Sequence, residues 1–130
     1  MAEAEQAIID RLLANAGVSA LVVNRIYFTE APQAPALPYI VIFRVGDRPV
    51  HSLECSSGLH FARLQIDGFA KTANTARAVM RAVKTSLDGF RGIQSTVDVQ
   101  SVLLLDSMDG YEEAPELKRV THDYRVCYRE

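Results

Sequence analysis

Two stretches of the chain repeat apolar residues at the spacing of an amphipathic helix. The pattern predicts one helix over about residues 3–16 and a second over about residues 72–88. Gly17 follows the first stretch and Gly89 follows the second, as is typical of helix ends. The residues expected to face the core are Ile8, Ile9, Leu12, Leu13 and Ala16 in the first helix and Ala76, Val79, Met80, Val83 and Leu87 in the second.

Four stretches have the apolar patterns of β-strands and are predicted at about residues 39–46, 59–69, 96–106 and 117–129. The run YIVIF at 39–43 is apolar at every position, which predicts a strand that is central in a sheet or covered on both faces. The remaining segments are predicted to be connections. These are VSALVVNRIYF, predicted to make a tight turn into a short extended piece, a Pro-rich irregular segment TEAPQAPALP, and loops at residues 46–58 and 107–116.

The predicted order of the main elements is α-β-β-α-β-β. Because the strands are joined by hairpin-like connections, the sequence predicts an α+β fold with a mostly antiparallel sheet of four to five strands. The two main helices are expected to pack on one face of that sheet. A length of 130 residues without internal repeats predicts a single domain over residues 1–130.

The charge composition gives no general drive toward nucleic acid, since 14 basic residues stand against 16 acidic ones for a net charge of −2. The longest apolar run is far shorter than the roughly 20 residues of a membrane-spanning helix. The N-terminal segment lacks the basic and apolar regions of a signal peptide. We therefore expect a protein made in a reducing cytoplasm, without membrane contact.

The histidines and cysteines do not form a recognisable metal or nucleophile motif. His122 and Cys127 are five residues apart, so a regular strand directs them to opposite faces. His51 and Cys55 lie near the predicted hairpin loop without a second paired motif at zinc-like spacing. Glycine-rich phosphate loops are lacking, and the carboxylates of 106–113 cluster in a charged turn. We expect no enzyme activity, no metal and no cofactor.

The second predicted helix carries a basic stripe opposite its apolar one, formed by Arg77, Arg81 and Lys84. A solvated helix face is the simplest interpretation. The alternative is a contact with an acidic surface, which the loop 107–116 of another copy could supply. Such a head-to-tail contact closes a ring when the rotation between copies is right. The stripe is therefore a candidate protomer–protomer interface.

Several short motifs, in this order, resemble the tail-completion, or tail-terminator, proteins of long-tailed bacteriophages, prophages and gene transfer agents. They are NRIYFTEAPQAPALPYIVIFRV, HSLECSSGLHFARLQIDGFAKTANTARAV, LDGFRG and the closing HDYRVCYRE, and the resemblance covers nearly the whole chain. It implies a structural virion protein that forms a ring, commonly of six copies. That ring caps the tail tube at its head-proximal end, stops tube polymerisation and joins the tail to the head connector.

The resemblance implies a homo-oligomer, a tail tube protein and a connector protein as partners. Candidate tube or connector contacts are the loop residues Asp47, Arg48, His51 and Glu54 of the first hairpin and Asp109, Tyr111, Glu112 and Glu113 of the acidic loop. DNA passing through the ring could meet Arg63 or Arg125. A small oligomeric ligand-binding or regulatory module is the competing interpretation, because an α+β fold alone does not decide function.

Overall fold

The computed structural model describes residues 4–29, 36–51, 56–94, 97–112 and 117–129, and for residues 48–51, 56–58 and 111–112 it describes the backbone alone. Three helices and six strands lie in these ranges. In chain order they are α1 (Ala4–Ala14), α2 (Ala16–Val22), β1 (Ile26–Phe28), β2 (Tyr39–His51), β3 (Ser56–Ala70), α3 (Ala73–Leu87), β4 (Gly92–Gln94), β5 (Val97–Glu112) and β6 (Leu117–Arg129).

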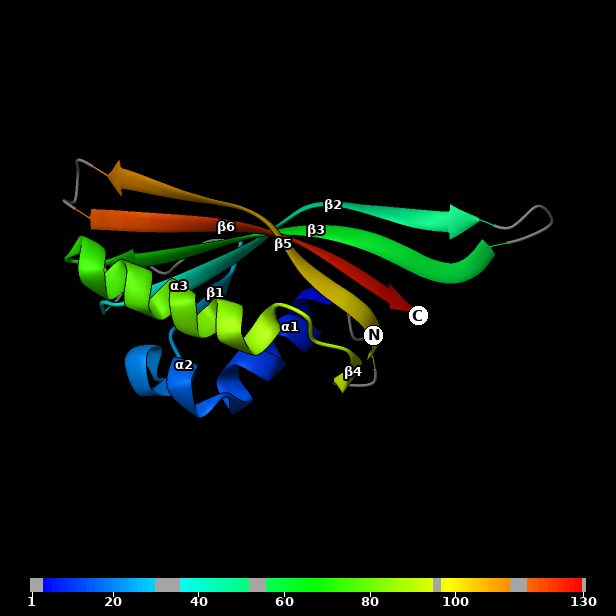
Figure 1. Cartoon of the computed structure of the whole chain (residues 1–130), viewed down its shortest axis with the longest axis horizontal. Coiled ribbons are helices and arrows are strands. Elements are labelled where there is room, and N and C mark those ends of the chain that lie inside the picture. The colour runs from blue at the N-terminus through cyan, green and yellow to red at the C-terminus, as the bar shows by residue number, and fades with distance from the viewer. Residues whose placement is uncertain (1–3, 30–35, 52–55, 95–96, 113–116, 130) are drawn as a thin grey trace.

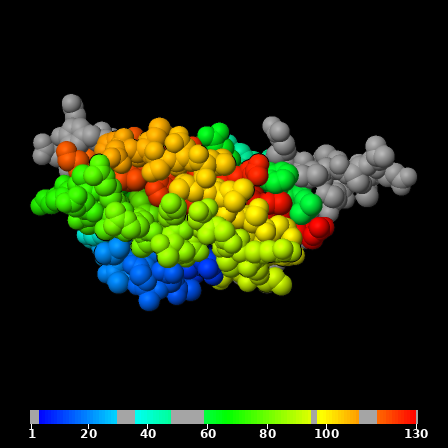
Figure 2. Space-filling view, viewed as in Figure 1, coloured from blue at the N-terminus to red at the C-terminus, as the bar shows by residue number. Residues whose placement is uncertain are grey.

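The strands form one twisted sheet in the order β1-β2-β3-β6-β5-β4. Only the β1–β2 pair is parallel, and all other neighbours in the sheet are antiparallel. The β2–β3 hairpin and the β5–β6 hairpin project in opposite directions along the long axis (Figure 1). The three helices lie together on one side of the sheet, as both overall views show (Figures 1 and 2). No helix among the described residues is long and apolar enough to cross a membrane.

The predicted α+β class is confirmed, but the predicted number of elements is wrong. The sheet has six strands instead of four to five, because β1 and β4 are three-residue strands too short to show a periodic pattern. A third helix, α2, begins after Asn15, whose side chain accepts a hydrogen bond from the Val18 N–H. Gly17 consequently lies inside α2 and does not end the first helix.

Both long loops predicted between strands are largely strand in the structure. Strand β2 continues to His51 and β3 begins at Ser56, although the segment between contains turn-forming residues. Strand β5 likewise continues to Glu112. Pairing with β3 and β6 extends these strands, because cross-strand hydrogen bonds override the local turn preference.

Helix α3 is the element that the sequence predicts best. Thr72 caps its N-terminus by accepting a hydrogen bond from the Thr75 N–H at 3.2 Å. All five residues of the predicted apolar stripe are buried. The helix ends at Leu87, and the C-cap residue Asp88 is followed by Gly89 with φ 82°, a conformation that favours glycine.

The hydrophobic core lies between the helices and one face of the sheet, whereas the opposite face is covered only in part. In β2, Ile40 and Ile42 are fully buried, whereas Phe43 is 45% exposed. Of the two alternatives predicted for residues 39–43, the structure has the inner strand, because β2 lies between β1 and β3. Coverage on both faces does not extend to Phe43. Helix α1 shows the same restriction, since Ile8 and Leu12 are buried but Leu13 is 40% exposed.

Helix α3 approaches β3 most closely at Gly68. A Cβ atom at this position would lie 2.6 Å from the sulfur of Met80 and 2.9 Å from its Cγ. We predict that Gly68→Ala lowers the free energy of unfolding by about 1–3 kcal/mol, as overpacking a core does. Denaturant unfolding measures the loss, and Gly46→Ala is the matched control because a Cβ there meets nothing within 4 Å. Equal midpoints for the two variants would contradict this packing.

His122 is a buried titratable group on the covered face of β6. Its Nδ1 lies 3.0 Å from the hydroxyl oxygen of Tyr124. Burial lowers the pKa of His122 below its ordinary value of 6.5, and the positive charge of Lys84 lowers it further. Burial, with a smaller contribution from the charge of Asp88, raises the pKa of Tyr124 above the usual range. Both groups are therefore neutral at pH 7.

The lowered pKa of His122 makes stability depend on pH. As the pH falls below 6.5, the unfolded chain binds a proton at His122 that the folded chain resists. We predict that the free energy of unfolding decreases from pH 7 toward pH 5, and that His122→Gln makes this decrease shallower. Chemical unfolding at several pH values measures both slopes. Identical slopes for the variant and the wild type would show that His122 does not contribute.

Candidate assembly surfaces

The face of the sheet opposite the helices exposes a group of apolar side chains. The strand register places Phe43, Phe61, Leu103 and Met108 on this face, from strands β2, β3 and β5. All are at least one-third exposed, with Met108 at 53%. We call this surface the helix-free face. Its exposed aromatic, leucine and methionine side chains have the composition of a protein–protein contact.

Charged residues run through the centre of the helix-free face. Arg63 and Arg125 lie directly opposite each other on β3 and β6, an arrangement of like charges that by itself destabilises a sheet. Arg63 is compensated by Asp123, with 2.9 Å between Nη2 and Oδ2. The guanidinium of Arg125 lies 5.3 Å from the centre of the Phe61 ring. The carboxylate of Asp123 is nearly buried, whereas the side chain of Arg63 is exposed. The charge that solvent or a partner can reach in this pair is therefore the positive charge of the arginine.

The basic stripe of α3 is exposed, but its first residue has a partner within the chain. Arg77 Nη2 lies 2.7 Å from Oδ2 of Asp109 on β5, and both side chains are more than half exposed. The acidic segment of the same chain therefore already supplies a partner for one residue of the stripe. Such an exposed ion pair contributes at most about 1 kcal/mol. Arg81 and Lys84 are exposed on the same helix.

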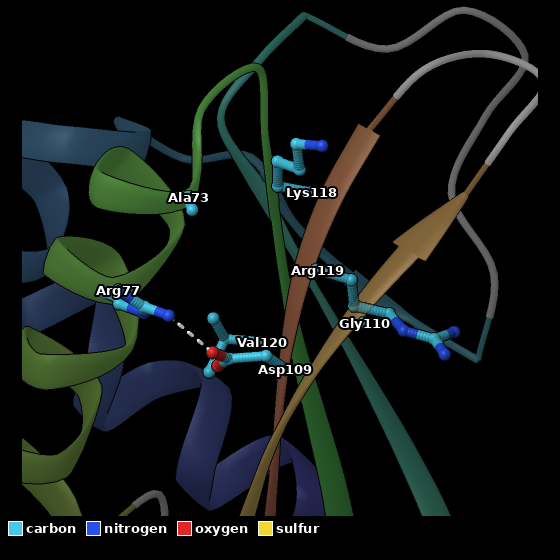
Figure 3. Close-up of a pocket in the computed structure, with 7 residues that line it drawn as sticks. All are labelled: Ala73, Arg77, Asp109, Gly110, Lys118, Arg119 and Val120. Carbon is cyan, nitrogen blue, oxygen red and sulfur yellow. Dashed lines mark hydrogen bonds and ion pairs between the residues drawn. The ribbon is translucent and has the colours of Figure 1, made fainter.

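A pocket of about 400 Å³ lies where the start of α3 meets β5 and β6. The close-up shows Arg77 directed toward Asp109, with Lys118 near the hairpin end (Figure 3). Arg119 extends away from α3, and its Nε would lie 3.1 Å from a Cβ at Gly110. The lining residues are Ala73, Arg77, Asp109, Gly110, Lys118, Arg119 and Val120. The lining therefore has three cationic side chains and one carboxylate.

A cluster of polar side chains lies at the base of the β2–β3 hairpin. Asp47 accepts a hydrogen bond from the hydroxyl of Tyr128 on β6, and its other oxygen lies 2.9 Å from Nδ1 of His60 on β3. The His60 and Tyr128 rings stack with centroids 5.1 Å apart. Arg44 continues the cluster, since its Nη1 lies 3.9 Å from Asp47 and 3.1 Å from the buried carboxylate of Glu5. The cluster links α1 to three strands.

The predicted contact residues are distributed over both hairpins. Asp47 belongs to the polar cluster just described, so its carboxylate has a structural role as well. The backbones of Arg48 and His51 lie in β2, and those of Tyr111 and Glu112 lie in β5, but their side chains lie outside the described residues. Glu54 and Glu113 also lie outside the described residues. The assignment of these eight residues to tube or connector contacts stays a prediction.

The pair formed by Glu5 and Arg44 was not predicted from the sequence. Glu5 stands three residues before Ile8, on the apolar stripe of the first helix, where a carboxylate is unusual. A carboxylate at that position is the feature of the sequence that could have indicated a buried ion pair.

The predicted orientation of His122 and Cys127 toward opposite faces is confirmed, because β6 pairs with β3 without a register shift. Cys127 is buried with a free thiol. The described part of the chain contains no group of three or more potential metal ligands.

A family model described as tail completion protein gp17 matches residues 6–129 of this chain. The chain belongs to this family. The match spans both helical stripes, the whole sheet and both hairpins. A member of the tail completion family is a structural component of a phage-type tail, and the surfaces described above are to be interpreted in that setting. A search of curated proteins finds no match.

Two solved structures share the fold of this tail completion protein. One is a chain from the virion of a native gene transfer agent particle, with a TM-score of 0.81 and 18% sequence identity. The comparison covers 98% of this chain and 95% of that one. A second, more distant chain has a TM-score of 0.51 and 9% identity, with 96% of each chain covered. At these identities the likeness establishes the fold.

The polar cluster at the hairpin base yields a test of its contribution to stability. We predict that Asp47→Ala lowers the free energy of unfolding by about 1–3 kcal/mol, because donors on His60 and Tyr128 lose their acceptor. Asp109→Ala is the control, since it removes only an exposed ion pair and should cost less than about 1 kcal/mol. Both values follow from denaturant unfolding. If Asp109→Ala lowered the free energy of unfolding more than Asp47→Ala, the cluster around Asp47 would not be the stronger contribution to stability.

Proposed function

We propose that this protein assembles as a ring, of six copies as the resemblance implies, on the head-proximal end of a tail tube. The ring ends tube polymerisation and forms the surface to which the head connector attaches. The observation that carries the proposal is the match of residues 6–129 to the tail completion family. The likeness to a chain of a gene transfer agent virion agrees with it. The proposed role is structural, without enzymatic activity.

The shape of the protomer supports a component that contacts a different partner at each of its two ends. The two hairpins point in opposite directions, so a ring of equally oriented copies carries one kind of hairpin on each side (Figure 1). Arg48, His51 and Glu54 belong to the first hairpin segment, and Tyr111, Glu112 and Glu113 to the second. We propose these segments as the contacts with tube and connector. DNA passing through such a ring could meet Arg63 and Arg125.

The exposed part of the basic stripe remains a candidate for contact between copies. Arg81 and Lys84 are exposed on α3, whereas Arg77 already pairs with Asp109. We therefore assign the interface role chiefly to Arg81 and Lys84. Surface charges of this kind steer association and set orientation more than they add affinity.

The competing interpretation is a ligand-binding or regulatory module. Small-molecule sites are predominantly apolar cavities with a few convergent polar groups. The pocket beside α3 combines Ala73, Gly110 and Val120 with three cationic side chains and one carboxylate. We interpret its charged groups as better suited to a macromolecular surface than to an apolar ligand.

Deletion of the gene from the cells that produce the particle tests the proposed function. We expect tails of unregulated length that do not join heads, and a return to joined particles of uniform tail length when the wild-type gene is supplied. Electron microscopy of negatively stained particles measures the tail lengths and the joined fraction. Joined particles of uniform tail length in the deletion strain would refute the role.

Complementation with Arg81→Glu combined with Lys84→Glu tests the basic stripe in the same strain. We expect fewer joined particles, with a defect in copy-to-copy association that is strongest at low salt. The matched control is Lys71→Glu combined with Arg91→Glu, which reverses two exposed charges outside α3. A double variant as effective as the wild type would remove the stripe from the interface.

A further inference from the structure

The centre of the helix-free face is a rectangle of four side chains from strands β5 and β6. Asp123 and Arg125 are two residues apart on β6, so their side chains lie on the same face. On β5, Leu103 lies opposite Arg125 and Asp106 lies opposite Asp123. The register shift between Leu104 and Asp106 keeps both β5 residues on this face. One diagonal of the rectangle therefore joins Arg125 to Asp106, and the other joins Leu103 to Asp123.

The first diagonal carries a positive and a negative charge, and both are accessible. Arg125 is exposed, and its guanidinium lies against the Phe61 ring without an ion pair to any described residue. Asp106 is exposed as well, and one of its carboxylate oxygens accepts a hydrogen bond from the N–H of Ser107 at 2.8 Å. Neither charge is neutralised by another charged side chain within the described part of the protomer.

The second diagonal carries no net charge. The carboxylate of Asp123 is nearly buried, and its Oδ2 lies 2.9 Å from Nη2 of Arg63. At the other end of this diagonal, the apolar side chain of Leu103 is 41% exposed. A surface that covers the second diagonal therefore meets an apolar side chain and an ion pair that is complete within the chain.

This arrangement is complementary to itself. Two copies that cover the same face of one another are related by a twofold axis, and each contact then occurs twice. An axis along the second diagonal exchanges the ends of the first, so Arg125 of each copy meets Asp106 of the other. Leu103 meets its own counterpart near the axis. Asp123 also approaches its counterpart, but each is neutralised by Arg63 of its own copy.

The apolar side chains beside the rectangle follow the same symmetry. Phe61 flanks the Arg125 end of the first diagonal, and Met108, two residues after Asp106, flanks the other end. The two side chains are 36% and 53% exposed. The axis that pairs Arg125 with Asp106 also brings Phe61 of one copy toward Met108 of the other, and a thioether beside an aromatic ring is a favourable contact.

We propose that the free protein forms a symmetric dimer through its helix-free faces, with Arg125 of each copy paired with Asp106 of the other. The two sheets then pack face to face about 10 Å apart, as in a β-sandwich. The inference goes beyond the proposed function, because it concerns the protein before assembly. Equally oriented copies in a ring are not related by twofold axes, so ring formation separates the dimer and uncovers the face.

Charge reversal in the purified protein tests this contact by sedimentation equilibrium. We expect the wild type to reach a mass of twice 14.4 kDa as its concentration rises. Arg125→Glu alone and Asp106→Arg alone each oppose like charges at two points of the dimer, so each should raise the dissociation constant by at least about tenfold. Arg81→Glu is the matched control, since it makes the same reversal on the exposed side of α3 and should change nothing. Thermal midpoints verify that each variant is folded.

Mixing the two single variants tests the twofold symmetry itself. In a mixed dimer the introduced glutamate meets the introduced arginine, and the unchanged Arg125 meets the unchanged Asp106. We therefore expect Arg125→Glu and Asp106→Arg to associate with each other although neither associates with itself. Failure of the mixture to form dimers would overturn the proposed pairing.

Cross-linking supplies a test that does not depend on charge. Leu103 lies near the proposed axis, so Leu103→Cys in a Cys55→Ser chain should be joined to its own counterpart by a short bifunctional maleimide. We expect covalent dimers and no larger species, because a contact of this symmetry closes after two copies. Leu13→Cys in the same background is the control, with a 40% exposed position on α1, and should give no dimer.

The remaining outcomes separate the dimer from the proposed function. A wild type that stays monomeric at every concentration would overturn the dimer, as would a dimer that both single variants leave intact. A monomer that binds a short DNA duplex through Arg125 would assign the face to DNA instead of a second copy. A ring-sized species in place of the dimer would overturn it and support the ring. Particles from the deletion strain test the proposed function independently of all these results.

Discussion

The close packing of α3 on the sheet decides which face remains available for other contacts. Gly68 leaves the space that Met80 occupies, and a Cβ atom there would clash with it. With α1, α2 and α3 all on that side, the core is completed on one face of the strands (Figure 1). The other face is exposed in the protomer, and it combines Phe61 and Met108 with arginines that have partners within the chain. Such a mixture is compatible with water and also with a protein surface.

The buried carboxylates show how this face tolerates charge. Asp67 accepts a hydrogen bond from the Thr121 hydroxyl at 2.6 Å, and Asp123 pairs with Arg63. Because each carboxylate has a partner, the cost of removing it from water is offset. The exposed charge that remains belongs mainly to arginine side chains. Arginine is also the charged residue that protein interfaces accommodate most readily, since its planar head stacks and forms several hydrogen bonds.

The sequence predicted those elements whose pattern is local. Helix α3 has a full apolar stripe, a capping threonine and a terminal glycine, and each of these signals lies within the helix or beside it. Strands β1 and β4 exist because Ile26 pairs with Ile40 and Gly92 with Val99, contacts that a three-residue pattern cannot reveal. The pair of Arg77 with Asp109 likewise joins residues 32 positions apart, so the two charges were visible in the sequence but their partnership was not.

The opposite directions of the two hairpins have a consequence for how such a protein can change. The β2–β3 hairpin and the β5–β6 hairpin extend from opposite ends of a sheet that is fixed by the core (Figure 1). If each hairpin makes one of the proposed contacts, substitutions in one hairpin leave the other hairpin unchanged. Under the proposed function, the two contacts can therefore vary independently.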